Sequence, residues 1–91
     1  MQVDQINRAD LITLVFQTTI GFAVWRDEHE PGADDPIAEA LQTSAAEAIR
    51  AGDDALLVLA SRRFLTYAAA RLEGLTSVDA LARAEAPLVA S

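Results

Sequence analysis

The densest group of chemically versatile side chains is the run Asp27-Glu28-His29-Glu30, followed by Asp34, Asp35 and Glu39. These residues offer carboxylate oxygens and the only imidazole of the chain. A helix brings metal ligands together when they stand three or four positions apart, whereas consecutive residues point in different directions around the axis. Asp35 and Glu39 have a suitable spacing, but Asp35 is better placed to cap a helix. We therefore expect no metal site and no cofactor.

Groups for covalent or acid–base catalysis are equally sparse. Glu28 and His29 can be drawn as a general acid–base pair, but no feature of the sequence places them in a cleft. The serines lie outside any G-x-S-x-G context, and the isolated glycines form no phosphate-binding loop. All seven basic residues are arginine, so neither a lysine Schiff base nor a P-loop lysine can exist here. We expect a protein that is not an enzyme.

Composition narrows the class of protein further. A chain of 91 residues makes one domain at most, and a hydrophobic content of 52% excludes a disordered tail. The absence of cysteine excludes a disulfide framework and fits a reducing compartment. The net charge of −7 argues against sequence-independent nucleic-acid binding and against docking on anionic membranes.

The longest apolar run, Leu11 to Trp25, has 15 residues, which is short of the roughly 18–20 that span a bilayer. Asp4 and Asp10 stand where a secretory signal would carry positive charge. We therefore expect a cytoplasmic protein, with a bacterial or phage source as the default.

Helix start and stop signals divide the chain into four predicted helices, residues 8–29, 36–50, 54–73 and 77–86. The residues that can cap their first turns are Asn7, Asp35, Asp53, and Thr76 or Ser77. Pro36 suits a first helical position, and Gly52 suits a left-handed cap. Val78, Leu81 and Ala82 give the last helix a short apolar face. The short connections predict antiparallel neighbours, and hence an all-α bundle of two long and two shorter helices in a single domain, 1–91, with loose ends at 1–6 and 87–91.

The segment 11–25 leaves an alternative open, because it is rich in residues that favour strands. A hairpin turning near residues 19–21 is that alternative. The polar positions follow helical spacing and show no period-2 alternation, which favours the helix. Gly21 then lies inside a helix, where a close helix crossing or a bend would explain it.

Apolar side chains cover more of both long helices than a chain of this size can bury. A surface helix of a small monomer shows an apolar stripe of roughly 100°, whereas the apolar residues of 8–29 leave only a narrow polar strip and those of 54–73 span more than half the circumference. A wider apolar arc implies that the helix is covered by other elements on several sides, and this short chain has few elements that could cover it. We therefore predict that homodimerisation completes the bundle.

The side chains predicted for an interface, with itself or with a partner, are aromatic residues, a leucine and an arginine, types typical of such surfaces: Leu14, Phe22, Trp25, Phe64, Tyr67 and Arg71. For Trp25 and Tyr67, membership of the core is the favoured interpretation, and an anchor at an interface is the alternative. Arg71 falls within an apolar arc, where its stem can lie along the core edge with its head in water or at the helix C-terminus. Its alternative is an ion pair with a carboxylate across the interface.

Charge is distributed unevenly along the chain. From Asp27 to Asp54 there are nine carboxylates and one arginine, whereas four arginines face two carboxylates from Arg62 to Arg83. This asymmetry can set the register of two copies. The predicted acidic partner surface consists of Asp27, Glu28, Glu30, Asp34 and Asp35. Acidic side chains interact favourably with helix N-termini, so part of this concentration of carboxylates can be explained by helix stability alone.

The leading functional hypothesis is a non-enzymatic protein that forms a homodimer and binds a protein partner. A second hypothesis is an acidic inhibitor or nucleic-acid mimic that occupies the basic groove of a target enzyme, as anti-CRISPR-type proteins do. A third is a virion or assembly subunit, which a large homo-oligomer would distinguish. A fourth is a ligand-binding bundle with a pocket lined by Phe22, Trp25, Phe64 and Tyr67.

Overall fold

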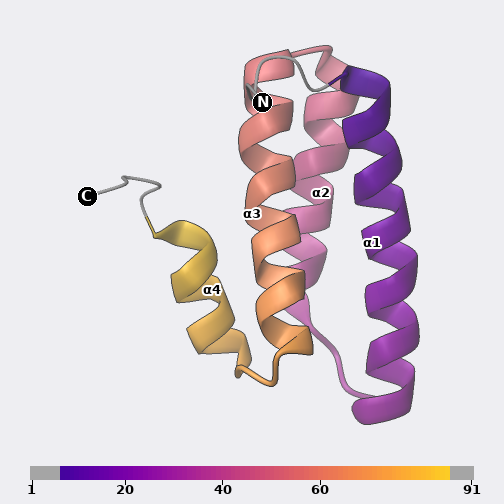
Figure 1. Ribbon diagram of the computed structural model, residues 1–91, viewed down its shortest axis with the longest axis vertical. Coiled ribbons are helices and arrows are strands. Elements are labelled where there is room, and N and C mark those ends of the chain that lie inside the picture. Colours follow the sequence, from indigo (N-terminus) through magenta and orange to yellow (C-terminus); the bar gives the residue numbers. More distant parts are fainter. Residues whose placement is uncertain (1–6, 87–91) are drawn as a thin grey trace.

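The computed structural model describes residues 7–86, which form four helices (Figure 1). The helices are α1 (Arg8–His29), α2 (Pro36–Ala51), α3 (Asp54–Leu72) and α4 (Ser77–Glu85). The prediction of a small all-α bundle is confirmed, and so are the helix boundaries to within one residue at each end. The hairpin alternative for residues 11–25 is wrong, because this segment lies within α1. The predicted loose ends at 1–6 and 87–91 lie outside the described residues.

Local capping chemistry accounts for where the helices begin. The side-chain oxygens of four residues accept a hydrogen bond from a backbone N–H in the first turn that follows, namely Asn7, Asp35, Asp53 and Thr76. Gly52 adopts φ 70° after α2, a left-handed conformation that glycine reaches without steric cost. The helices begin and end close to one another in sequence, so the connections between them are short. Consecutive helices therefore run antiparallel (Figure 1).

Helix α3 is the centre of the fold, since α2, α4 and α1 all pack against it while α1 contacts α2 only slightly. Phe64 and Tyr67 on α3 are fully buried. Helix α2 meets them with residues spaced three and four apart, which put one face of the helix in the core: Ala38, Leu41, Ala45 and Ala48. Because most of these side chains are small, α2 can lie close to α3.

Helix α4 turns a different face to the core from the one that we predicted. Ala80 is fully buried and Ala84 packs at the edge of the core, whereas Val78 is 74% exposed. Of the predicted face, Leu81 alone packs against the core, and Ala82 is exposed. The short alanine side chains allow α4 to approach α3, and the larger valine is left in solvent.

Gly21 does not mark a close helix crossing. A Cβ atom built on this residue meets no atom within 4 Å, apart from its own helix backbone and chain neighbours. The close-crossing explanation is therefore wrong, and the missing side chain instead leaves open surface beside α1.

Candidate interaction surfaces

The predicted interface residues divide into a buried set and an exposed one. Phe22, Phe64, Tyr67 and Arg71 are all buried within the single chain. Trp25 is half-buried and stacks on the Phe22 ring, with ring centroids 5.8 Å apart. Leu14 alone of the six is classed as exposed. The four buried residues are thus core residues, because helical periodicity does not distinguish a side chain buried by its own chain from one buried by a second copy.

Tyr67 belongs to a buried polar network at the end of the bundle where α1 is joined to α2. Its hydroxyl lies 2.8 Å from both carboxylate oxygens of Asp35 and donates to that carboxylate. Asp35 also accepts the backbone N–H of Ala38, at 3.0 Å. Burial, supported by the hydrogen bond to Asp35 and its negative charge, raises the pKa of Tyr67 above its ordinary value, although Ser77 and the positive charge of Arg71 act in the opposite direction.

Arg71 extends the same network toward α1. It forms an ion pair with Glu30, donates to the carbonyl oxygen of Leu75 at 2.8 Å, and lies 5.5 Å from the Trp25 ring centroid. Its Nε lies 3.7 Å from a carboxylate oxygen of Asp35. Burial lowers the pKa of Arg71, but the hydrogen bond to Glu30 and the surrounding negative groups raise it above its ordinary value. The head of Arg71 thus lies just beyond the C-terminal end of α3, near the place that the sequence favoured, and its carboxylate contacts lie within its own chain and not across an interface.

The predicted acidic partner surface is smaller than the sequence suggested. Asp27, Glu28 and Asp34 are exposed, but Asp35 is buried as the α2 cap and Glu30 is half-buried against Arg71. Two of the five carboxylates therefore stabilise the fold from within. The capping part of this arrangement was visible in the sequence, but the contacts of Asp35 and Glu30 with α3 join residues 32 and 41 positions apart.

A row of large apolar side chains runs along α1 away from the core. Phe16, Ile20 and Val24 are 60%, 66% and 52% exposed, and their spacing of four puts them on one side of the helix. We call these three residues the α1 stripe. The buried residues of α1 are Leu11, Val15 and Phe22, so α1 carries apolar side chains on both its inner and its outer face. The wide apolar arc of residues 8–29 was the signal in the sequence that could have located the stripe.

A shallow groove lies between α1 and α3. It has a volume of about 270 Å³ and is lined by small and apolar residues: Thr18, Gly21, Phe22, Leu65, Ala68, Ala69 and Leu72. The open space at Gly21 forms part of it, and Leu72 on α3 is half exposed. The groove adds apolar surface to the α1 side of the molecule.

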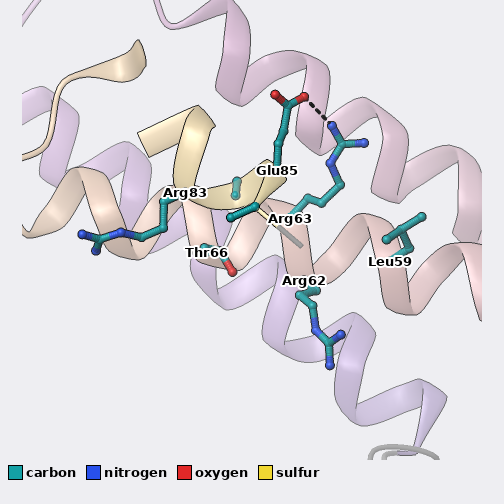
Figure 2. A pocket seen from close by; sticks show the side chains of 8 residues that line it. Leu59, Arg62, Arg63, Thr66, Arg83 and Glu85 are labelled. Atoms are coloured by element: carbon teal, nitrogen blue, oxygen red, sulfur yellow. Dashed lines mark hydrogen bonds and ion pairs between the residues drawn. The ribbon is translucent and has the colours of Figure 1, made fainter. Parts of the chain in front are cut away.

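A second cleft, of about 440 Å³, lies between α3 and α4 (Figure 2). Its lining residues are Leu59, Arg62, Arg63, Thr66, Arg83, Ala84, Glu85 and Ala86. We call it the arginine cleft, because it collects three of the seven arginines of the chain. Figure 2 shows their guanidinium groups pointing in different directions around the cleft.

Carboxylates of the same chain partly neutralise the arginine cleft. Arg63 donates to Glu85 at 2.9 Å across the α3–α4 boundary, and Arg83 lies 3.3 Å from a carboxylate oxygen of Glu73. All four side chains are solvent-exposed at these contacts, so water and salt weaken both pairs. Among residues 7–86, Arg62 forms no ion pair.

Within the described part of the chain, no three acidic, histidine or cysteine side chains gather in a way that could hold a metal ion. Among these same residues, no helix has the length and hydropathy needed to cross a membrane. Comparisons of the chain with known protein families, with curated proteins and with solved structures find no match. Three surfaces of the described residues carry chemistry that could recognise a partner: the α1 stripe, the α1–α3 groove and the arginine cleft.

Proposed function

We propose that this chain is a non-enzymatic protein that acts through association, as a homodimer that binds a further protein on its remaining surface. The observation that carries the proposal is the α1 stripe. Three large apolar side chains, each more than half exposed, follow one another on the outer face of the helix. Contiguous exposed apolar patches mark interaction sites.

A second copy of the chain is the occupant that the α1 stripe fits best. The stripe is evenly spaced about Ile20, so an antiparallel copy would place Phe16 against Val24 of the second copy, with Ile20 on the two-fold axis. Such an isologous contact is self-complementary and closes after two subunits. The segment 11–25 has no charged residue, so this arrangement brings no like charges together along the apolar contact.

The ends of the stripe fit the same register. Asp27 lies on the same side of the helix as the stripe and, in the antiparallel arrangement, would stand opposite the hydroxyl of Thr13 of the second copy. A carboxylate would therefore meet a hydrogen-bond donor and not another carboxylate. An interface of standard size buries about 800 Å² per partner, and the α1–α3 groove beside the stripe supplies further apolar area.

The test is light scattering on a size-exclusion column over a wide range of protein concentration. We expect the wild-type chain to run as a dimer and the Ile20→Glu variant as a monomer with unchanged helical circular dichroism. Ala46→Glu, at an exposed position on α2, is the matched control and should remain dimeric. A monomeric wild type at every concentration would refute the dimer, and a large closed oligomer would favour the assembly-subunit hypothesis.

Cross-linking tests, separately from the mass, whether Ile20 lies at the contact between two copies. Because the chain has no cysteine, Ile20→Cys introduces a single thiol next to the proposed two-fold axis. A short thiol-specific cross-linker should convert this variant to covalent dimers, while Ala46→Cys should stay monomeric on a denaturing gel. Equal cross-linking of both variants would contradict the placement of Ile20 at the contact.

The acidic-inhibitor hypothesis has weaker support. Asp35 and Glu30 are engaged by Tyr67 and Arg71 of the same chain, which leaves Asp27, Glu28 and Asp34 as its exposed carboxylates at this end of the bundle. These three residues remain the candidate contact with a basic protein surface.

A further inference from the structure

We propose that the arginine cleft between α3 and α4 binds an acidic, partly apolar segment of a partner protein. The arginine cleft is a different surface from the α1 stripe, and binding in the cleft does not depend on dimerisation. The cleft volume of about 440 Å³ lies within the range of roughly 300–1,000 Å³ that is typical of ligand-binding clefts. It therefore has room for a few side chains of a bound segment.

The charge of the cleft selects the chemistry of the occupant. Three arginines, Arg62, Arg63 and Arg83, line the cleft together with one carboxylate, Glu85, so positive charge prevails there in a chain whose net charge is −7. Guanidinium groups pair with carboxylates through two parallel hydrogen bonds. Beyond about 10 Å, salt screens the other charges of the molecule, which leaves the nearby arginines to decide what binds.

The arrangement of the arginines favours an extended segment over a small anion. Their guanidinium groups point in different directions (Figure 2) and do not converge on one point, as the cradle of a single phosphate would require. Leu59 and Ala84 also line the cleft and provide apolar contact between the charged groups. A segment that alternates acidic and apolar side chains matches this pattern of an apolar floor with arginines around it.

Two carboxylates of the chain itself already pair with arginines of the cleft. Glu85 pairs with Arg63 and Glu73 pairs with Arg83. Both pairs are solvent-exposed, and exposed pairs are weak, so an incoming carboxylate can replace either one without a large loss of stability. Arg62, which forms no ion pair among the described residues, is the position where a partner carboxylate meets no competitor.

Fluorescence anisotropy of a labelled peptide tests the proposal directly. The probe is a fluorescein-labelled dodecapeptide of alternating glutamate and leucine with flanking serines, titrated with the full chain at low and high salt. We expect saturable binding that weakens as salt rises. The double variant Arg62→Gln/Arg83→Gln should bind about tenfold more weakly, the combined effect of two exposed charge pairs.

Controls separate the cleft from the overall charge and from self-association. Arg50→Gln removes one positive charge from an exposed position on α2 and should leave binding unchanged. The Ile20→Glu variant should bind the peptide as the wild type does, whether or not the α1 stripe forms a dimer. Absence of saturable binding, or an equal loss in Arg50→Gln, would overturn the proposal.

Two further probes distinguish the source of the negative charge. A labelled single-stranded oligonucleotide of similar charge should bind much more weakly than the peptide, and equal binding would overturn the assignment to an acidic protein segment. A peptide copying residues 26–36 of this chain should also bind more weakly. If it binds more tightly than the glutamate–leucine probe, the occupant is a second copy of this chain and the proposed separate partner is wrong.

Discussion

Alkaline pH should destabilise this protein through a single side chain. The chain has one tyrosine, no lysine and no cysteine, and arginine stays protonated throughout the accessible range. Tyr67 is therefore the only side chain that titrates between about pH 9 and 11. It is fully buried and donates its hydroxyl proton to Asp35, so ionisation would place two negative charges side by side in the core.

The direction and size of the effect follow from linkage. Burial, and then the contact with Asp35, raises the folded-state pKa of Tyr67 above the value of about 10 for an unfolded chain. The folded state thus keeps the phenolic proton at pH values where the unfolded chain has lost it. The contribution of the protonated Tyr67 to the free energy of unfolding is complete below about pH 10, and it is lost as pH rises through the folded-state pKa. For one proton, the free energy of unfolding falls by at most about 1.4 kcal/mol per pH unit.

The assay combines urea unfolding at several pH values with the ultraviolet absorbance of the phenolate. We expect Tyr67→Phe to remove the alkaline slope. At neutral pH the same variant should lose about 1.5–3 kcal/mol, because a hydrogen bond to a buried charged group is gone, and its Tm should fall by about 4–8 °C for each kcal/mol. A slope that persists in Tyr67→Phe, or a phenol that titrates at its ordinary pKa in the folded chain, would refute the reasoning.

Two further predictions concern single positions in the helices, both measured by urea unfolding. Ser61→Ala should stabilise by about 1 kcal/mol, because the buried Ser61 hydroxyl has no hydrogen-bond partner among residues 7–86; unchanged or lower stability would contradict this. Gly21→Ala should stabilise by about 0.5–1 kcal/mol, since the new methyl group meets open space, whereas Gly52→Ala should destabilise by about 1–2 kcal/mol at φ +70°. Changes of the same sign at both glycines would rule out the conformational explanation.

The helices could be predicted from the sequence because their boundaries are set by local chemistry. Asp53 and Thr76 each bond a backbone N–H only three residues ahead, and Gly52 provides a left-handed cap. These interactions lie within a few positions of one another, so residue type and spacing were sufficient. Helix packing follows less directly, since α4 turns Ala80 and not Val78 to the core.

The role of each apolar side chain was less predictable than its helix. Phe64 and Tyr67 have the residue types of an interface, but both are fully buried by their own chain. Phe16 and Ile20 belong to the same apolar arc as the core residues of α1, yet they lie outside. Which side of α1 packs against α3 depends on contacts between segments that are far apart in sequence. A local sequence pattern does not indicate such contacts.

The polar network was predictable only in part. The role of Asp35 as a cap follows from the Pro36 that comes after it. Its second role, as acceptor for Tyr67, joins positions 32 residues apart, and the pairing of Arg71 with Glu30 spans 41. The sequence placed Arg71 within an apolar arc and left a carboxylate pair as an alternative, but it did not indicate that the carboxylate belongs to the same chain.

The central position of α3 has a consequence for the order in which the molecule opens. Helices α2 and α4 are bound to α3, their immediate neighbour in the chain, whereas α1 reaches α3 past α2 and contacts α2 only slightly. Contacts between sequence neighbours form fastest, so we expect α1 to dock last and to detach first. Native-state hydrogen exchange should then show the backbone amides of α1 exchanging through a partial opening, while those at the centre of α3 wait for global unfolding.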